Sequence, residues 1–165
     1  MKLLFAFLAL SCGLIFSSHL FAEPRESLRP VLRAEQSFVI VQACSDHARK
    51  QGWKMAIAVF DHRATLVAYL KMDDVKRGNE EIAQRKGEAA AAYGRESKYW
   101  SNRALENPVY LEMPLFPAFE GGEPIYSSGG VLVGGVGVSG SSGSNDATCA
   151  RIGIEAAGLS YVYPD

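Results

Sequence analysis

Near the end of the chain, residues 134–140 read Gly-Gly-Val-Gly-Val-Ser-Gly and precede a predicted helix. From Gly135 onward this spells G-x-G-x-x-G, the fingerprint of a loop that binds the pyrophosphate of a dinucleotide. Such a site also needs an acidic residue about 20 positions further on and more strands to complete the sheet. Glu155 follows Gly140 by only 15 residues, inside the predicted helix, and only a short strand at 161–163 remains. We therefore reject a dinucleotide site.

Two other interpretations of the glycine-rich string stay open. Glycine in a strand costs backbone entropy and commonly marks close approach by another group. Residues 139–143 read Ser-Gly-Ser-Ser-Gly and offer amides and hydroxyls just before a helix N-terminus, where an anion is favoured. The same serines can simply cap that helix, with Ser144 or Asn145 at the N-cap position. The sequence favours capping slightly over anion binding.

Lys86 is the most interesting charged residue of the second predicted helix. It lies four residues from both Ile82 and Ala90, so its stem is expected to cross apolar surface with the amine at a boundary. The amine can pair with a carboxylate or an anionic ligand, or it can be solvated or structurally paired. Lys86 and Glu88 project in different directions from a helix, so they do not form an obvious acid–base pair.

The remaining chemistry-bearing residues indicate no familiar catalytic or zinc site. No Gly-x-Ser-x-Gly elbow is present, and no Ser-His-Asp set is recognisable from spacing. Neither His-x-x-His nor CxxC occurs, which argues against structural zinc.

The first 22 residues read as an export signal. A basic Lys2, a short apolar core and a small residue, Ala22, at a polar boundary describe a secretory signal peptide at 1–22. The alternative is an uncleaved membrane anchor; lipid attachment at Cys12 fits less well because the apolar run continues beyond it. We predict a periplasmic or secreted chain, residues 23–165, with no further membrane span.

Composition then bounds what the exported chain can be. Without the signal peptide, 143 residues remain, a normal size for a single domain with its own core. Their 16 basic and 18 acidic side chains nearly balance, and no basic stripe appears. Nucleic-acid binding therefore has no support, and a small molecule is the favoured partner.

Two cysteines remain in the predicted mature chain. Export would permit a disulfide between Cys44 and Cys149. Cys44, however, lies on the apolar stripe of the first predicted helix, whereas Cys149 lies off the stripe of the last one. We interpret Cys44 as a small buried apolar residue and expect no disulfide.

Apolar periodicity and turn residues predict an alternation of helices and paired strands. The predicted helices span residues 27–50, 79–95, 97–105 and 144–157, and the second carries a stripe of small residues, Ala83, Gly87, Ala90 and Gly94. So small a face can approach a sheet, a partner helix or a flat ligand closely. The predicted strands span residues 53–60, 65–72, 124–126, 130–139 and 161–163. Short turns between paired strands favour an α+β fold with an antiparallel sheet.

Several motifs together resemble the GlcG/HbpS family of haem-binding-like proteins. Residues 121–126 read Gly-Gly-Glu-Pro-Ile-Tyr, the string at 134–140 follows, and Asp146 comes soon after. The family pattern is G-G-x-P-[IL], a turn, G-[AG]-[IV]-G-V-S-G and a nearby Asp. Upstream, Asp61 ends the first strand of a hairpin, and the resemblance covers residues 27–158.

The chain departs from the family pattern at two places. The hairpin turn at 61–64 reads Asp-His-Arg-Ala where the family usually has D-x-x-G. The helix motif at 86–90 reads Lys-Gly-Glu-Ala-Ala, with Ala89 where the family often has threonine. If that hydroxyl contributes to the ligand site in relatives, this chain lacks it.

The resemblance implies a profilin-like sandwich, with a sheet of about five strands, that forms dimers or larger oligomers. It implies haem or another small anionic ligand, held beside the glycine-rich strand by residues that we predict to be Lys86, Gly121, Gly122, Pro124, Ser139, Gly140 and Asp146. His62 at the hairpin tip is the preferred candidate for binding haem iron, and Tyr126 is a second. The alternatives are a small-molecule catabolic enzyme of isomerase or lyase type, an accessory subunit of glycolate or diol metabolism, or an oligomer without cofactor.

Overall fold

The computed structural model describes residues 29–164, so the predicted signal peptide at 1–22 lies outside the described part of the chain. In chain order the elements are α1 (Ala34–Gln51), β1 (Ala56–Asp61), β2 (Leu66–Lys71), α2 (Arg77–Tyr93), α3 (Ser97–Glu106), the 3-10 helix η1 (Pro108–Glu112), β3 (Gly122–Tyr126), β4 (Leu132–Ser139) and α4 (Gly143–Ala156). Within residues 29–164, no helix is both long and apolar enough to cross a bilayer.

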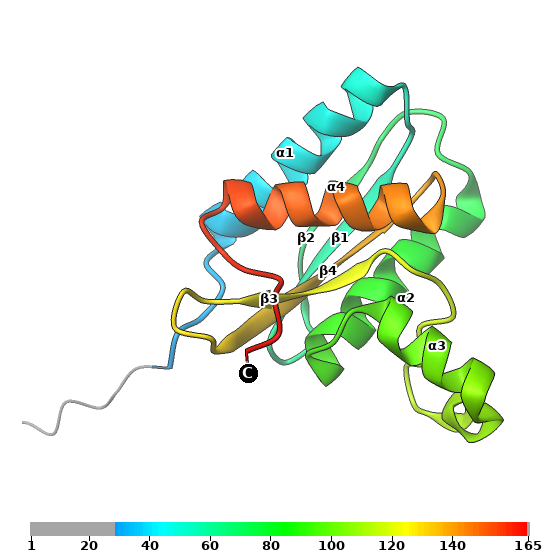
Figure 1. Ribbon diagram of the computed structural model, residues 1–165. Coiled ribbons are helices and arrows are strands. Elements are labelled where there is room, and N and C mark those ends of the chain that lie inside the picture. Colours follow the sequence, from blue (N-terminus) through cyan, green and yellow to red (C-terminus); the bar gives the residue numbers. More distant parts are fainter. Residues whose placement is uncertain (1–28, 165) are drawn as a thin grey trace, which may run out of the picture.

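The strands form one antiparallel sheet in the order β2-β1-β4-β3. Figure 1 shows α1 and α4 on one face of this sheet and α2 on the other. The predicted α+β class with an antiparallel sheet is confirmed. The sheet has four strands rather than five, because the segment at 161–163 forms no strand; its neighbour Ser160 instead makes an isolated bridge to Tyr126.

The main core lies between the sheet and the α1–α4 layer. Successive strand residues point to opposite faces, so Ile57, Val59, Val136 and Val138 share the face that α1 and α4 cover. From the helices, Ile40 and Ile154 fill the same core, and all six of these side chains are at most 1% exposed. The strands β1 and β4 are covered on both faces, which explains why they read as nearly continuous apolar and glycine runs.

On the opposite face of the sheet, α2 packs directly against mostly small side chains. Ala58, Gly135 and Gly137 face the helix there. A Cβ added at Gly87 of α2 would lie 2.7 Å from the Gly137 amide nitrogen and 2.9 Å from the Ala58 carbonyl oxygen. A Cβ at Gly137 would overlap the carbonyl oxygen of Ala83. The small-residue stripe predicted on this helix therefore serves contact with the sheet.

Two helix boundaries differ from the prediction. Helix α1 begins at Ala34 rather than residue 27. Its buried face includes Ser37 and Ile40, whereas the apolar Phe38 is 63% exposed. The predicted stripe was displaced because an apolar residue need not be buried, whereas a serine can be when its hydroxyl is bonded, here to the Arg33 carbonyl. Helix α2 begins at Arg77, two residues before the predicted start at residue 79.

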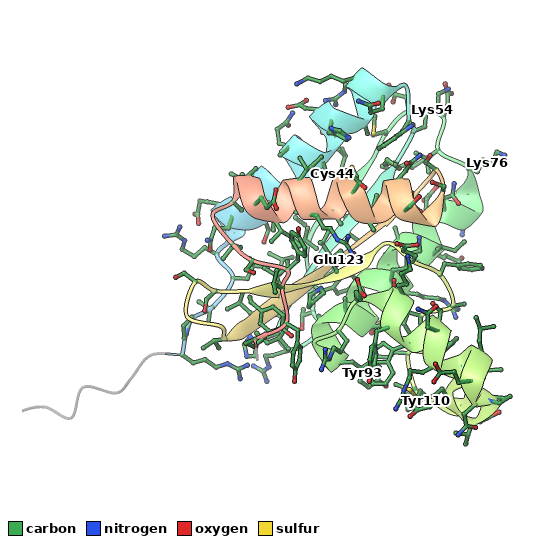
Figure 2. All side chains as sticks on the ribbon, viewed as in Figure 1. Cys44, Lys54, Lys76, Tyr93, Tyr110 and Glu123 are labelled. Carbon is green, nitrogen blue, oxygen red and sulfur yellow. A yellow bond between two sulfur atoms is a disulfide. The ribbon has the colours of Figure 1, made fainter. Side chains whose placement is uncertain are left out.

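The expectation of free cysteines was wrong, because Cys44 and Cys149 form a disulfide that joins α1 to α4. Their Cα atoms are 4.8 Å apart, and both side chains are fully buried. Gly153 lets the two helices approach, since a Cβ there would lie 2.6 Å from the Ile40 carbonyl oxygen. The stripe argument failed because α4 buries a wide face, which includes Cys149. Figure 2 shows Cys44 where the two helices cross.

We predict that Gly137→Ala lowers the free energy of unfolding by about 3 kcal/mol or more, because backbone atoms of α2 occupy the position of the new methyl group. Gly78→Ala in α2 is the control, because no atom lies within 4 Å of the Cβ it would add. It should be neutral or stabilising by up to about 1 kcal/mol. Urea unfolding measures both variants, and equal effects would contradict the direct contact between helix and sheet.

Removal of the disulfide by Cys44→Ala plus Cys149→Ala should cost about 2–5 kcal/mol of unfolding free energy, because the bond closes a long loop in the unfolded chain. The two cysteines are 105 positions apart. Urea unfolding with and without reductant tests this in the parent chain, and the double variant should not respond to reductant. Two titratable thiols in the unreduced, denatured mature chain would contradict the disulfide.

Candidate functional site

At the centre of the predicted site, Lys86 and Asp146 form a buried ion pair. Lys86 extends from α2, and its Nζ lies 3.0 Å from Asp146 Oδ2 and 2.9 Å from the Val138 carbonyl oxygen. Asp146 belongs to the first turn of α4, and both residues are 2% exposed. The pair therefore links α2, β4 and α4 at one point.

The glycines at 121 and 122 close this pair from the side. Gly121 has φ +117, and a Cβ there would lie 2.6 Å from the Cβ of Asp146 and 2.9 Å from Lys86 Nζ. Gly122 packs on the backbone of Lys86, where a Cβ would be 2.9 Å from the carbonyl carbon. Its amide donates to the Ser97 hydroxyl at 2.9 Å. The first half of the G-G-x-P motif is thus the wall of the ion pair.

Burial makes both charges costly. Desolvation lowers the pKa of Lys86, and the attraction of Asp146 opposes that shift. Desolvation likewise raises the pKa of Asp146, opposed by Lys86 and by hydrogen bonds from the Ser141 and Gly140 amides. A buried pair with additional hydrogen-bond partners can persist as a structural clamp.

Backbone amides of the turn before α4 donate hydrogen bonds to the Asp146 carboxylate. The Ser141 amide donates to Asp146 Oδ1 at 3.0 Å. Ser142, rather than Ser144 or Asn145, is the N-cap, and its hydroxyl accepts from the Asn145 amide at 3.3 Å. Capping, which the sequence favoured, is thus present, and Asp146 takes the position of an anion at this helix end.

The other predicted residues lie apart from the ion pair. The hydroxyl of Ser139 lies 3.4 Å from Asn79 Oδ1. His62 is at the tip of the β1–β2 hairpin, where Asp61 accepts from the Arg63 and Thr65 amides. Tyr126 is 3% exposed and donates its hydroxyl proton to the Gly94 carbonyl. Pro124 lines a different hollow, at the outer edge of β3.

A hollow beside the Lys86 helix was not predicted from the sequence. It has a volume of about 270 Å³ and lies between α2 and the segment 116–119, with walls from Ile82, Arg85 and Phe119. A second hollow of about 520 Å³, which Met113 also lines, shares Arg85 and Phe116 with the first. We call the two together the α2 groove.

The small-residue stripe of α2 marks only the helix face that contacts the sheet, whereas the α2 groove lies on another face of the helix. The signal for the outer face was Ile82 and Arg85, one helical turn apart, followed downstream by residues 113–119, Met-Pro-Leu-Phe-Pro-Ala-Phe. Two prolines keep that segment irregular, and its phenylalanines line the smaller hollow. Phe119 is 58% exposed.

Comparisons with known proteins agree with this architecture. Residues 32–155 match the family model described as haem degrading protein HbpS-like. The chain is 33% identical over 110 residues to Protein GlcG of Escherichia coli (strain K12), covering 66% of this chain and 81% of GlcG. The crystal structure of HbpS superimposes with a TM-score of 0.70 at 27% identity, covering 75% of this chain and 88% of HbpS. A PduOC:heme complex, at 21% identity, shares the fold with a TM-score of 0.73 over 80% of this chain and 99% of PduOC.

Removing one partner of the ion pair should be far more harmful than neutralising both. Lys86→Met leaves the Asp146 carboxylate buried without its cation and should cost about 3–5 kcal/mol of unfolding free energy. Adding Asp146→Asn keeps an acceptor for the Ser141 amide and should recover at least about 1 kcal/mol. Chemical denaturation of both variants measures the difference. Additive losses in the double variant would show that the two side chains act independently.

Proposed function

The chain belongs to the GlcG/HbpS-like family, and we propose that it is an exported protein that binds haem, or a similar flat anionic ligand, in the α2 groove. Its membership confirms the resemblance inferred from the glycine motifs at 121–126 and 134–140. The observation that carries the proposal is the α2 groove itself, in which Arg85 lines both hollows beside apolar and aromatic side chains. The relative PduOC, captured with haem, supports the choice of ligand.

The composition of the α2 groove fits a porphyrin. Ile82, Phe116 and Phe119 offer apolar surface to a flat macrocycle, as ligand pockets usually do. Arg85 stands where the two hollows meet, so its planar guanidinium can bind a peripheral carboxylate through two hydrogen bonds. Two carboxylates, Glu81 and Glu88, also line the groove, and Glu81 Oε1 lies 3.8 Å from the Arg77 guanidinium.

This location differs from the sequence-based expectation that the Lys86 amine meets the ligand. That amine already donates to Asp146 and to the Val138 carbonyl, so we assign the role of anion partner to Arg85, one residue earlier on the exposed side of α2. Of the predicted site residues, Lys86 also lines the smaller hollow, and the segment 116–119 ends two positions before Gly121.

Two side chains are candidates for binding the iron. Haem iron is commonly held by His, Met, Cys or Tyr, and Met113 lines the larger hollow of the α2 groove. His62, the ligand predicted from the sequence, lies on the β1–β2 hairpin and lines neither hollow. It stays a prediction, and comparing the two substitutions decides between them.

Export is the second part of the proposal. The Cys44–Cys149 disulfide supports it, because such bonds persist in oxidising compartments such as the periplasm and the extracellular space. The signal-like segment at 1–22 supplies the route. Fractionation of cells that express the full chain, followed by intact-mass measurement, should find a periplasmic or secreted chain beginning at Glu23. A cytoplasmic chain with reduced cysteines would contradict export.

Haemin titration of the purified protein should produce a shifted Soret band that saturates at one haem per chain. Arg85→Gln should weaken binding about tenfold, because it removes a charge-assisted hydrogen bond, and Phe119→Ala should weaken it comparably through lost apolar contact. Lys50→Gln, an exposed change at the end of α1, is the matched control. Unchanged affinity in both groove variants would rule out the α2 groove as the site.

The Soret position then identifies the iron ligand. If Met113→Ala shifts the band and His62→Ala does not, the thioether is the ligand, and the reverse result identifies the histidine. Native electrospray of the same samples counts subunits and bound haem together. It thereby tests the self-association that family membership implies, which stays a prediction.

A further inference from the structure

A separate cavity of about 290 Å³ lies at the outer edge of β3, away from the α2 groove. We call it the β3-edge cavity. Its walls come from Arg95 and Glu96 just before α3, from Arg151 of α4, and from the tail after α4, while Glu123 of β3 also lines it. Figure 1 shows that tail running back past β3. The walls contain two arginines, two glutamates and three tyrosines, a density of polar groups unlike that of the core.

The β3-edge cavity exists because the edge of β3 is only partly covered. At one end of the strand the Gly122 amide is bonded to Ser97, and at the other end Tyr126 exchanges two backbone hydrogen bonds with Ser160. Pro124 lies between these points with the same outward orientation, and it has no amide proton to donate. The chain therefore does not extend the sheet here.

The Glu123 carboxyl is the most unusual group in the β3-edge cavity. It occupies the unspecified position of the G-G-x-P motif and is 1% exposed. One Arg151 nitrogen donates to Glu123 Oε1 and to Glu96 Oε2, both at 2.9 Å. Figure 2 places Glu123 between β3 and α4. A single guanidinium thus serves two carboxylates, and Arg151 Nε is buried with no hydrogen-bond partner among residues 29–164.

Burial raises the pKa of Glu123 to about 7, and Arg151 opposes that shift without cancelling it. The carboxylates of Glu96 and Glu120 push the pKa in the same direction as burial. Tyr161 faces the same group of charges from the tail. Near neutral pH the carboxyl is therefore close to half protonated, and in its protonated form the β3-edge cavity holds two guanidinium groups against the Glu96 carboxylate.

We propose that the β3-edge cavity binds a small carboxylate with a flat apolar body, such as an aromatic monocarboxylate. Arg95 and Arg151 bind the ligand's carboxylate, and the protonated Glu123 donates a hydrogen bond to one of its oxygens. Pro124 and Val162, which also line the cavity, contact the apolar body of the ligand.

The aromatic residues favour an anion over a cation because arginines already occupy their faces. The Arg95 guanidinium carbon lies 3.2 Å from the Tyr163 ring centroid, and that of Arg151 lies 5.2 Å from the Tyr161 centroid. These stacks hold both guanidinium groups in place before a ligand arrives. An ammonium ligand would have to displace them, against two like charges.

Binding is therefore coupled to a proton on Glu123. Because the competent form is protonated, the apparent affinity follows the protonated fraction, and with a pKa of about 7 the dissociation constant should be about tenfold larger at pH 8 than at pH 6. At pH 8 each bound ligand should take up nearly one proton from the buffer. Binding raises the pKa of Glu123 further, since the ligand adds a negative charge beside it.

Calorimetric titration of the full mature chain with benzoate tests this, at pH 6, 7 and 8 in two buffers of different ionisation enthalpy. We expect the tenfold change and the proton uptake derived above. No binding of millimolar benzoate at pH 6, or binding without proton uptake at pH 8, would overturn the proposal. Equal affinity for inorganic phosphate or for benzylamine would also overturn it, by showing a site for any anion or for a cation.

Two variants test whether Glu123 acts through its proton or only stabilises the fold. Glu123→Gln resembles the protonated acid, so it should bind benzoate with a dissociation constant that changes less than about twofold between pH 6 and 8, without proton uptake. Arg95→Gln should weaken binding at least about tenfold and leaves the buried pair of Arg151 and Glu123 intact. Lys50→Gln is again the control. A Glu123→Gln variant that folds but retains the parent pH dependence would refute the proton linkage.

Discussion

The direct contact between the backbone of α2 and the backbone of β4 determines where every other group can lie. Gly87 and Gly137 have no room for a Cβ, so the helix lies closer to the sheet than side-chain packing would allow. At this short separation the Lys86 side chain reaches the Val138 carbonyl and Asp146 at the start of α4. The glycines that resemble a nucleotide fingerprint therefore position a helix, and through the helix they position a charge.

The ion pair that results uses the anion-binding potential of the helix terminus. A helix N-terminus preceded by serines is a common anion site, but here Asp146 occupies it and binds Lys86 at the same time. Burial of both charges is expensive, and such pairs do not generally add stability compared with apolar residues. Their geometry is demanding, however, so the pair sets how α2, β4 and α4 meet. The other side of α2, with Arg85, faces the segment 113–119 across the α2 groove.

The sequence predicted the fold well because it is encoded by local periodicity, glycine placement and short turns. The hairpin at 61–64 and the glycine strand were legible in this way. Three features were not. The disulfide depends on how α1 crosses α4, which the phase of each helix alone does not specify. The partner of Lys86 is 60 positions away in the sequence. The α2 groove needs a wall from an irregular segment, 113–119, whose path no periodicity describes.

The two buried carboxylates on this chain differ in a way that separates structure from function. Asp146 has one cation of its own and accepts backbone amides, so its charge is balanced within the fold. Glu123 shares Arg151 with Glu96, so three charged groups carry one net negative charge in a poorly solvated place. Such a cluster lowers its energy by taking up a proton on Glu123, after which Arg95 and Arg151 face only the Glu96 carboxylate. The cavity beside Glu123 gives a carboxylate ligand access to these two guanidinium groups, whereas Gly121 closes the cluster around Asp146. A buried charge that the fold balances holds elements together, and one that the fold leaves unbalanced beside an open cavity remains available to a ligand.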